Sequence, residues 1–192
     1  EHVFTVGGEG KITRWSAAEG QALESYHLAN QALRCIDFCE TRNEIAVGGS
    51  DNAIYFLDAG TLELRHSLPQ AHANSVFTVR YCPNGRHLLS GGRDAHLNVW
   101  DLDYGHQKIH TQPAHWYTIN HLVFHPDGHQ FATASRDKTV KIWDAANFKL
   151  LKVLETIRDG GHLNSVNRLA WFSDGLVSTG DDRSLIVWRL TV

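Results

Sequence analysis

Several residue types and patterns are scarce or missing in this sequence of 192 residues, which has no methionine, four prolines and three cysteines. No apolar run approaches the length of about 18 residues that a membrane-spanning helix needs, so we expect no membrane partner. Cys35, Cys39 and Cys82 form neither an even disulfide framework nor a CxxC pair, which predicts reduced, half-buried thiols. We therefore expect a cytoplasmic protein, or a nuclear one if the source is eukaryotic.

A strong charge of either sign is also lacking, because 18 Lys and Arg residues stand against 21 Asp and Glu residues and leave a net charge of −3. A surface adapted throughout to nucleic acid would be strongly basic. Nucleic acid is therefore not the partner that we expect, and only a local basic patch stays open. With 42% hydrophobic residues, the composition is that of a soluble globular protein.

What the sequence does contain is a repeat. The stretch RDKTVKIWD, residues 136–144, recurs as RDAHLNVWD at 93–101 and DDRSLIVWR at 181–189, with weaker copies SDNAIYFLD at 50–58 and GEGKITRWS at 8–16. The equivalent positions, at intervals of 42, 43, 43 and 45 residues, are Trp15, Leu57, Trp100, Trp143 and Trp188. A period of about 20–50 residues indicates a solenoid, a propeller or an array.

The clearest copy, residues 114–154, resolves into four short strands. INHLVF, QFATAS, VKIWDA and FKLLKVL are the predicted strands, separated first by the turn HPDG and then by RDKT. Pro126 and Gly128 suit a chain reversal, and CPNG and FSDG stand at the same place in neighbouring copies. A four-stranded sheet cannot bury both faces alone, so neighbouring sheets must stack. The sequence therefore predicts an all-β fold, a β-propeller of four-stranded antiparallel blades.

These features resemble the WD-repeat β-propeller family, which is named for a Trp–Asp pair at the end of the third strand. Trp100–Asp101 and Trp143–Asp144 match this pair outright. Trp15–Ser16 and Trp188–Arg189 keep the Trp, whereas Leu57–Asp58 keeps only the Asp. With five aligned copies, the resemblance covers nearly the whole chain.

We divide the chain, as a single propeller domain over 1–192, into a leading half-blade at 1–16 and repeats at approximately 17–58, 59–101, 102–144 and 145–189. This gives about four and a half blades. The family usually closes with seven, so the resemblance implies a fragment of a seven-bladed parent, with roughly 110 residues in front of residue 1. The missing methionine and the strand-like opening HVFTVGG agree with that expectation. The alternative is a second subunit that completes the ring.

Three repeats carry polar residues at fixed distances from the Trp. The hydroxyl-bearing residue lies ten positions before it, the Asp six positions before it, and a His 20–22 positions before the Asp. The three sets are His72, Ser90, Asp94 and Trp100; His115, Thr133, Asp137 and Trp143; and His162, Ser178, Asp182 and Trp188. In the family such a tetrad forms a hydrogen-bonded chain within the blade. Donor and acceptor chemistry permits it, from the indole N–H through the hydroxyl and imidazole to the carboxylate.

A Ser–His–Asp trio also invites a catalytic interpretation. Recurrence in three successive blades, each time with a Trp, is not how a single active site is built, so we assign the tetrads a structural role and predict no catalytic residue. The first two copies depart from the pattern: Thr5 and Glu9 precede Trp15, and Val47 and Ala29 replace the hydroxyl and the His of the second copy. We expect that second blade to rely on apolar packing alone.

Thirteen histidines raise the question of a metal ion. His121, His125 and His129 are spaced by four, which would align them on a helix, but here they fall on a strand and a turn. No Cys or carboxylate cluster joins them at a ligand spacing, so we expect no metal site. The glycine-containing segments GGSD, GGRD and TGDD are strand ends rather than a phosphate loop before a helix, and we expect no cofactor.

The resemblance implies a non-enzymatic scaffold that holds a partner protein or peptide on the top face of the propeller. Two other classes of function stay open. An enzyme would need acid and base groups unique to one blade in a channel pocket. A chromatin- or nucleic-acid-associated propeller would need a coherent basic patch.

In the family, partner contacts often lie three and five positions after the His and one position before the Asp. The corresponding residues are Ala32, Arg34 and Ser50; Ser75, Phe77 and Arg93; Thr118, Asn120 and Arg136; Ser165, Asn167 and Asp181; and Gly8 in the half-blade. Trp116 and Tyr117 follow a tetrad His and are expected nearby.

Such positions can simply form a solvated rim. Aromatic and arginine side chains, however, are frequent interface hot spots, and guanidinium groups pair bidentately with carboxylate or phosphate. We therefore predict an acidic or phosphorylated peptide as the partner, with Arg93 and Arg136 as its main charge contacts.

Overall fold

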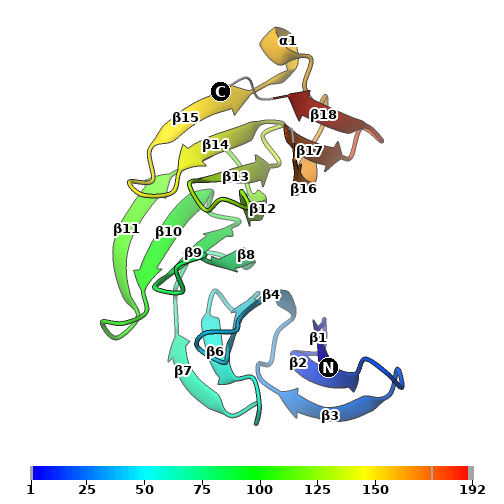
Figure 1. Ribbon diagram of the computed structural model, residues 1–192, viewed down its shortest axis with the longest axis vertical. Coiled ribbons are helices and arrows are strands. Elements are labelled where there is room, and N and C mark those ends of the chain that lie inside the picture. The colour runs from blue at the N-terminus through cyan, green and yellow to red at the C-terminus, as the bar shows by residue number, and fades with distance from the viewer. Residues whose placement is uncertain (1, 174, 190–192) are drawn as a thin grey trace.

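The computed structural model describes residues 2–173 and 175–189, which form five antiparallel sheets in sequence order (Figure 1). The first sheet contains β1 (His2–Val6), β2 (Lys11–Ser16) and β3 (Ala22–His27). The second sheet contains β4 (Leu33–Cys39), β5 (Glu44–Gly49), β6 (Ile54–Asp58) and β7 (Leu64–Leu68). The third sheet contains β8 (Val76–Tyr81), β9 (His87–Gly92), β10 (His96–Asp101) and β11 (Gln107–Pro113).

The fourth sheet contains β12 (Ile119–Phe124), β13 (Gln130–Ser135), β14 (Val140–Asp144) and β15 (Leu150–Leu154). The fifth sheet contains β16 (Val166–Phe172), β17 (Gly175–Gly180) and β18 (Leu185–Arg189). Between them lies one helical turn, α1 (Thr156–Asp159). In every sheet the strands are paired in the order in which they occur along the chain. The predicted all-β fold of antiparallel propeller blades is confirmed.

The sheets stand side by side along an arc (Figure 1). The inner strands β4, β8, β12 and β16 lie on the inside of the arc, and the last strands β3, β7, β11 and β15 lie on its outside. Neighbouring sheets meet through their inner strands, because β4 contacts β8, β8 contacts β12, and β12 contacts β16. The arc therefore brings side chains from different sheets toward one central space.

Tight approach between sheets depends on small residues in the second strands, which are almost completely buried. A Cβ atom on Gly48 would lie 2.7 Å from Cγ1 of Val76 in the next sheet, and one on Gly91 would lie 2.8 Å from Cγ2 of Ile119. Both distances are shorter than real Cβ contacts. Glycine at these positions thus lets the inner strand of one sheet rest against the next.

Apolar clusters fill the space between successive sheets. Phe56 of β6 packs with Trp100 of β10 between the second and third sheets, and Phe131 and Trp143 pack with Leu97 between the third and fourth. Stacking buries apolar surface that a single sheet would leave in water, at roughly 25 cal/mol per Å². The alternating apolar residues of the repeat therefore form one core per pair of sheets.

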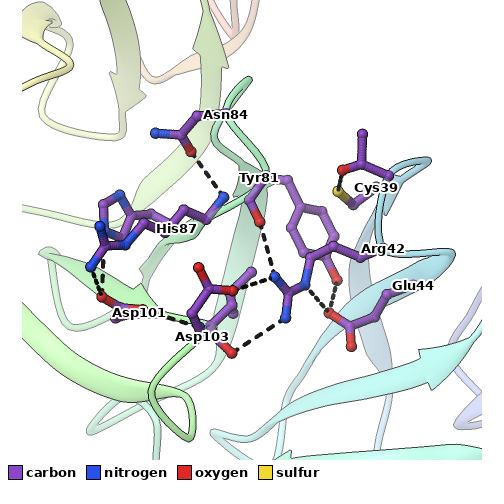
Figure 2. Close-up of polar contacts among 12 residues, drawn as sticks. Cys39, Arg42, Glu44, Tyr81, Asn84, His87, Asp101 and Asp103 are labelled. Atoms are coloured by element: carbon purple, nitrogen blue, oxygen red, sulfur yellow. Dashed lines mark hydrogen bonds and ion pairs between the residues drawn. The ribbon is translucent and has the colours of Figure 1, made fainter.

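A partly buried network of ionic and polar groups joins the second and third sheets (Figure 2). The Tyr81 hydroxyl donates a hydrogen bond to Glu44 Oε1 at 3.0 Å, and Arg42 Nε lies 3.7 Å from the same oxygen. Arg42 Nη1 also donates to Asp103 Oδ1 at 2.8 Å. Burial and then the Glu44 carboxylate raise the pKa of Tyr81. Because the groups come from both sheets, the network fixes one sheet against the other.

The strand arrangement differs from the predicted repeats in one respect. The leading sheet has three strands, whereas the predicted half-blade over 1–16 has two. The additional strand, β3, lies within the predicted repeat 17–58 but pairs with β2. The strands β7, β11 and β15 likewise pair with the sheet before the boundary at which the predicted repeat ends. The predicted repeats end at or just after the Trp position, whereas each of these sheets continues for one more strand.

Among the described residues, no helix is both long and apolar enough to cross a membrane.

Candidate interaction face and central cavity

The third sheet contains a continuous hydrogen-bonded chain built from one predicted tetrad. Trp100 Nε1 donates to Ser90 Oγ at 2.8 Å, and the same oxygen lies 2.8 Å from His72 Nε2. The other ring nitrogen, Nδ1, lies 3.0 and 3.1 Å from the two carboxylate oxygens of Asp94. Asp94 also accepts the backbone N–H of Ala73 at 2.9 Å, which secures the loop that carries the histidine. One tetrad thus connects two strands, β9 and β10, with the turn between them and the loop before β8.

The fourth sheet repeats this geometry with threonine as the hydroxyl-bearing residue. Trp143 Nε1 donates to Thr133 Oγ1 at 2.9 Å, which lies 2.7 Å from His115 Nε2. His115 Nδ1 lies 2.8 Å from Asp137. The structure therefore brings all four predicted residues of this set together.

The fifth sheet holds the third set in the same arrangement. The distances are 2.8 Å from Trp188 Nε1 to Ser178 Oγ, 2.7 Å from that oxygen to His162 Nε2, and 3.0 Å from His162 Nδ1 to Asp182. All three hydroxyl-bearing residues, in this sheet and the two before it, are 0% exposed. A hydroxyl that is buried and already bonded on both sides cannot approach a substrate, which favours the structural role for the tetrads.

The tetrad carboxylates are held in their charged form. Burial alone would raise the pKa of Asp94, but the His72 hydrogen bond and charge and the backbone N–H groups outweigh it and lower the pKa to about 2. The pKa of Asp137 is lowered for the same reasons, with Thr139 as a further donor. Burial also lowers the pKa of His115 despite the neighbouring Asp137. In the fourth sheet, at neutral pH, the charged Asp137 thus faces a neutral His115 imidazole.

The first two sheets contain only parts of a tetrad. Trp15 Nε1 donates to Thr5 Oγ1 at 2.8 Å, so the first sheet keeps the indole–hydroxyl bond. In the second sheet, Asp51 accepts the Tyr55 hydroxyl and the backbone N–H of Ala53. The prediction that this sheet relies on apolar packing alone is wrong, because a tyrosine hydroxyl from the neighbouring strand satisfies the carboxylate.

Some predicted contact residues meet on the inner side of the arc. Arg34 donates from Nε to Ser50 Oγ at 2.6 Å, and its guanidinium carbon lies 5.8 Å from the centroid of the Phe77 ring. Asn120 Nδ2 donates to Ser165 Oγ at 2.9 Å and to the Val166 carbonyl at 2.8 Å. The Arg34–Phe77 contact and the Asn120 hydrogen bonds connect neighbouring sheets along the inside of the arc.

One cavity joins four of the predicted residues. Its volume is about 440 Å³, and its lining residues are Arg34, Phe77, Asn120, Asn167 and Arg168. They come from β4, β8, β12 and β16, so the inner strands of four sheets contribute to one space. We call it the central cavity.

The other predicted contact residues lie outside this cavity. Arg93 and Arg136 are exposed at strand-to-strand turns, where their backbone N–H groups donate to Ser75 and Thr118. Asp181 is also exposed and accepts a hydrogen bond from Asn167 Nδ2 at 2.6 Å.

The two predicted aromatic contacts are strongly exposed. Trp116 is 86% and Tyr117 61% exposed, although the Trp116 backbone N–H is anchored by Asp137 at 3.0 Å. The tetrad thus fixes the turn while both aromatic rings face solvent.

Three polar residues of the inner strands were not predicted to line a cavity: Arg80, His121 and Arg168. A second cavity of about 330 Å³ is lined by all three, together with Arg34 and Phe77. The only available signal was a charged or polar residue inside a run of strand-forming residues, as in FTVRY and VNRLAW. His121 is thus part of a cavity wall rather than of a histidine cluster, and no group of metal-binding side chains occurs in the described part of the chain.

Comparison with known proteins agrees with the repeat pattern. The family model of the WD domain, G-beta repeat, matches residues 62–101, 106–144 and 149–189. These segments include all three complete tetrads, whereas the first sheet and β4–β6 of the second sheet lie in front of them.

Two curated proteins illustrate the similarity. Protein groucho of Drosophila melanogaster is 26% identical over 103 residues, which cover 54% of this chain and 14% of groucho. Cilia- and flagella-associated protein 43 of Xenopus laevis is 31% identical over 94 residues, which cover 48% of this chain and 6% of that protein. The matched region thus spans a small part of the length of these relatives.

Proposed function

This chain belongs to the WD domain, G-beta repeat family, and from that premise we propose that it is a non-enzymatic scaffold that binds a partner protein or peptide on the top face of its propeller. WD repeats generally mediate protein–protein interaction. The observation that carries the proposal is the anchored but exposed pair Trp116 and Tyr117. Large aromatic side chains that are held in place but not buried are typical interface anchors.

The partner proposed from the charges is an acidic or phosphorylated segment. Arg93 and Arg136 occupy the same position in adjacent sheets, and neither forms an ion pair among the described residues. A guanidinium group without an internal carboxylate is available for a carboxylate or phosphate of a partner. We keep the cytoplasm, or the nucleus of a eukaryote, as the proposed location.

A catalytic role receives less support from the geometry. The three Asp–His–hydroxyl sets recur with nearly equal distances, and the hydroxyl of each is buried. An active site in a repeat protein requires groups that differ from one repeat to the next. The supporting geometry is therefore that of a rigid frame for exposed side chains.

The test uses two rim variants and two matched controls. Proteins retained by the immobilised wild-type chain are compared with those retained by Trp116→Ala/Tyr117→Ala and by Arg93→Ala/Arg136→Ala. Leu150→Ala/Leu151→Ala and Lys149→Ala/Lys152→Ala remove similar apolar area or charge from the exposed outer edge of the fourth sheet.

We expect at least one partner to bind both rim variants at least tenfold more weakly than the wild-type chain and to bind both control variants normally. The melting temperatures of the rim variants should equal that of the wild-type chain. Equal retention by all variants would place the interaction elsewhere.

A further inference from the structure

Two arginines of the central cavity have no acidic partner within the described residues. Arg42, Arg65, Arg80 and Arg86 each form an ion pair with a carboxylate at 3.0 Å or less. Arg34 and Arg168 form none, although both line the same cavity of about 440 Å³. Other unpaired arginines, such as Arg93 and Arg136, do not line it. Arg34 and Arg168 therefore concentrate uncompensated positive charge in one concave site.

The Arg34 guanidinium is held in place by neutral groups. Its Nε donates to Ser50 Oγ at 2.6 Å, and its plane lies near the Phe77 ring at 5.8 Å from the centroid. An arginine over an aromatic ring loses little freedom when it binds an anion, because the ring already restricts it. Its two terminal amino groups have no hydrogen-bond acceptor among the described residues, so they remain available.

The Arg168 guanidinium is positioned in a similar way from the opposite sheet. Its Nη1 donates to the backbone carbonyl of Asn167 at 3.0 Å and to that of Asn120 at 3.4 Å. Both acceptors are neutral and therefore orient the group without cancelling its charge. Its Nε and Nη2 have no acceptor in the described part of the chain.

The surroundings add little negative charge. Arg80, in the adjoining cavity, already pairs with Asp37 at 2.9 Å. His121 accepts the backbone N–H of Leu169 at Nδ1, and burial, followed by the charges of Arg80 and Arg168, lowers its pKa to about 4. The imidazole is thus neutral at pH 7 and adds no charge to the cavity wall. The exposed Asp181 carboxylate already accepts a hydrogen bond from Nδ2 of the lining residue Asn167 at 2.6 Å.

We propose that Arg34 and Arg168 form an oxyanion site in the central cavity, which binds a phosphate or carboxylate carried by the segment that the scaffold holds. The site rests on the proposed function but uses residues other than the rim arginines. Guanidinium groups bind both oxyanions through paired hydrogen bonds. A phosphate monoester, with nearly two negative charges at pH 7, matches two arginines better than a carboxylate does.

The first experiment observes arginine side-chain Nε–H resonances of the ¹⁵N-labelled chain by NMR. The probes are N-acetyl-phosphoserine N-methylamide and N-acetyl-glutamate N-methylamide, with sodium chloride at equal ionic strength as the control. We expect the Arg34 and Arg168 resonances to shift in a saturable way with both probes and not with chloride. Half-saturation should need at least tenfold less of the phosphoserine probe than of the glutamate probe. Shifts spread over all exposed arginines would overturn the site, since they would show charge screening only.

The second experiment compares Arg34→Gln/Arg168→Gln with Arg93→Gln/Arg136→Gln, which removes the same charge from the rim. Loss of phosphoserine binding by at least tenfold in the first variant alone supports the cavity site. Loss in the rim variant alone overturns it while leaving the proposed rim function intact. If the cavity variant fails to fold, the wild-type NMR result decides by itself. If the rim variants retain every partner as well as the wild-type chain does, while phosphoserine binding is normal, the proposed function is refuted and the cavity site stands.

Discussion

Replacement of Thr133 by valine tests the tetrad most directly, because the two side chains have nearly the same shape. Thr133 is 0% exposed, and its hydroxyl contacts both Trp143 Nε1 at 2.9 Å and His115 Nε2 at 2.7 Å. Without the hydroxyl, two buried polar groups lose their partner, and each such loss destabilises by about 1–3 kcal/mol. We expect Thr133→Val to lower the free energy of unfolding by about 2–4 kcal/mol.

The second sheet supplies a matched reverse substitution. Val47 occupies the equivalent buried position, with Leu57 and Ala29 where the Trp and His stand in the complete sets. Val47→Thr therefore introduces a hydroxyl that has neither partner, and we expect it to destabilise by about 1–3 kcal/mol. We thus expect threonine to be the more stabilising residue at position 133 and valine at position 47.

Urea unfolding followed by far-UV circular dichroism measures both variants, with equal m-values as the check that the unfolded states are comparable. A double variant, Thr133→Val/Trp143→Phe, should lose less than the sum of its single variants, because removal of the indole N–H leaves one orphaned donor fewer. If Thr133→Val changes stability by less than 0.5 kcal/mol, on the order of an ordinary surface substitution, the hydrogen-bonded chain does not stabilise the blade and the structural assignment fails.

Three further predictions concern the rest of the fold. Tyr81→Phe should destabilise by about 1–3 kcal/mol, because buried Glu44 loses a donor, whereas the exposed Tyr104→Phe should have no effect in the same denaturation assay. Burial lowers the pKa of His121 and of His106 from 6.5 to about 4, so the stability that these neutral histidines contribute is present above pH 6.5 and is lost as the pH falls toward 4. After allowance for solvent screening, the free energy of unfolding should fall by about 1–2 kcal/mol per histidine between pH 7.5 and pH 5. In urea titrations, His121→Gln should reduce this dependence of stability on pH. Because the two end sheets expose large hydrophobic side chains, Val3 on β1 and Leu185 and Val187 on β18, light scattering should show association that reverses on dilution. A monodisperse monomer at all concentrations would contradict this expectation.

The fold could be predicted because the same pattern of strands and turns occurs five times in the sequence. A single RDKTVKIWD stretch is compatible with any hairpin, but copies at intervals of 42–45 residues require equivalent sheets that stack. The tetrad spacing was equally informative, since a His 22 residues before an Asp can reach it only when loop and strand return to the same place, as His72 and Asp94 do.

Sequence reasoning identified Arg34 as a contact residue but could not predict its meeting with Arg168, which depends on how the sheets are arranged. Arg34 and Arg168 are separated by more than a hundred residues, and only the arc brings β4 and β16 to one cavity. No spacing within a repeat encodes that meeting. The Tyr55–Asp51 hydrogen bond was missed for a different reason, because it replaces a family pattern by a local solution found in one sheet alone.

The distribution of repeated and non-repeated residues separates the frame from the site. Position by position, the tetrads keep His, a hydroxyl, Asp and Trp through three sheets, and each member is buried or bonded inside the blade. The inner-strand position five residues after the tetrad His, or after Ala29 in the second sheet, instead carries Arg34, Phe77, Asn120 and Asn167 in successive sheets. A frame that is the same in each blade leaves recognition to the positions that differ, because only these can distinguish one partner from another. The central cavity consists of such positions, and a partner that binds there would be selected by the two arginines at its opposite sides.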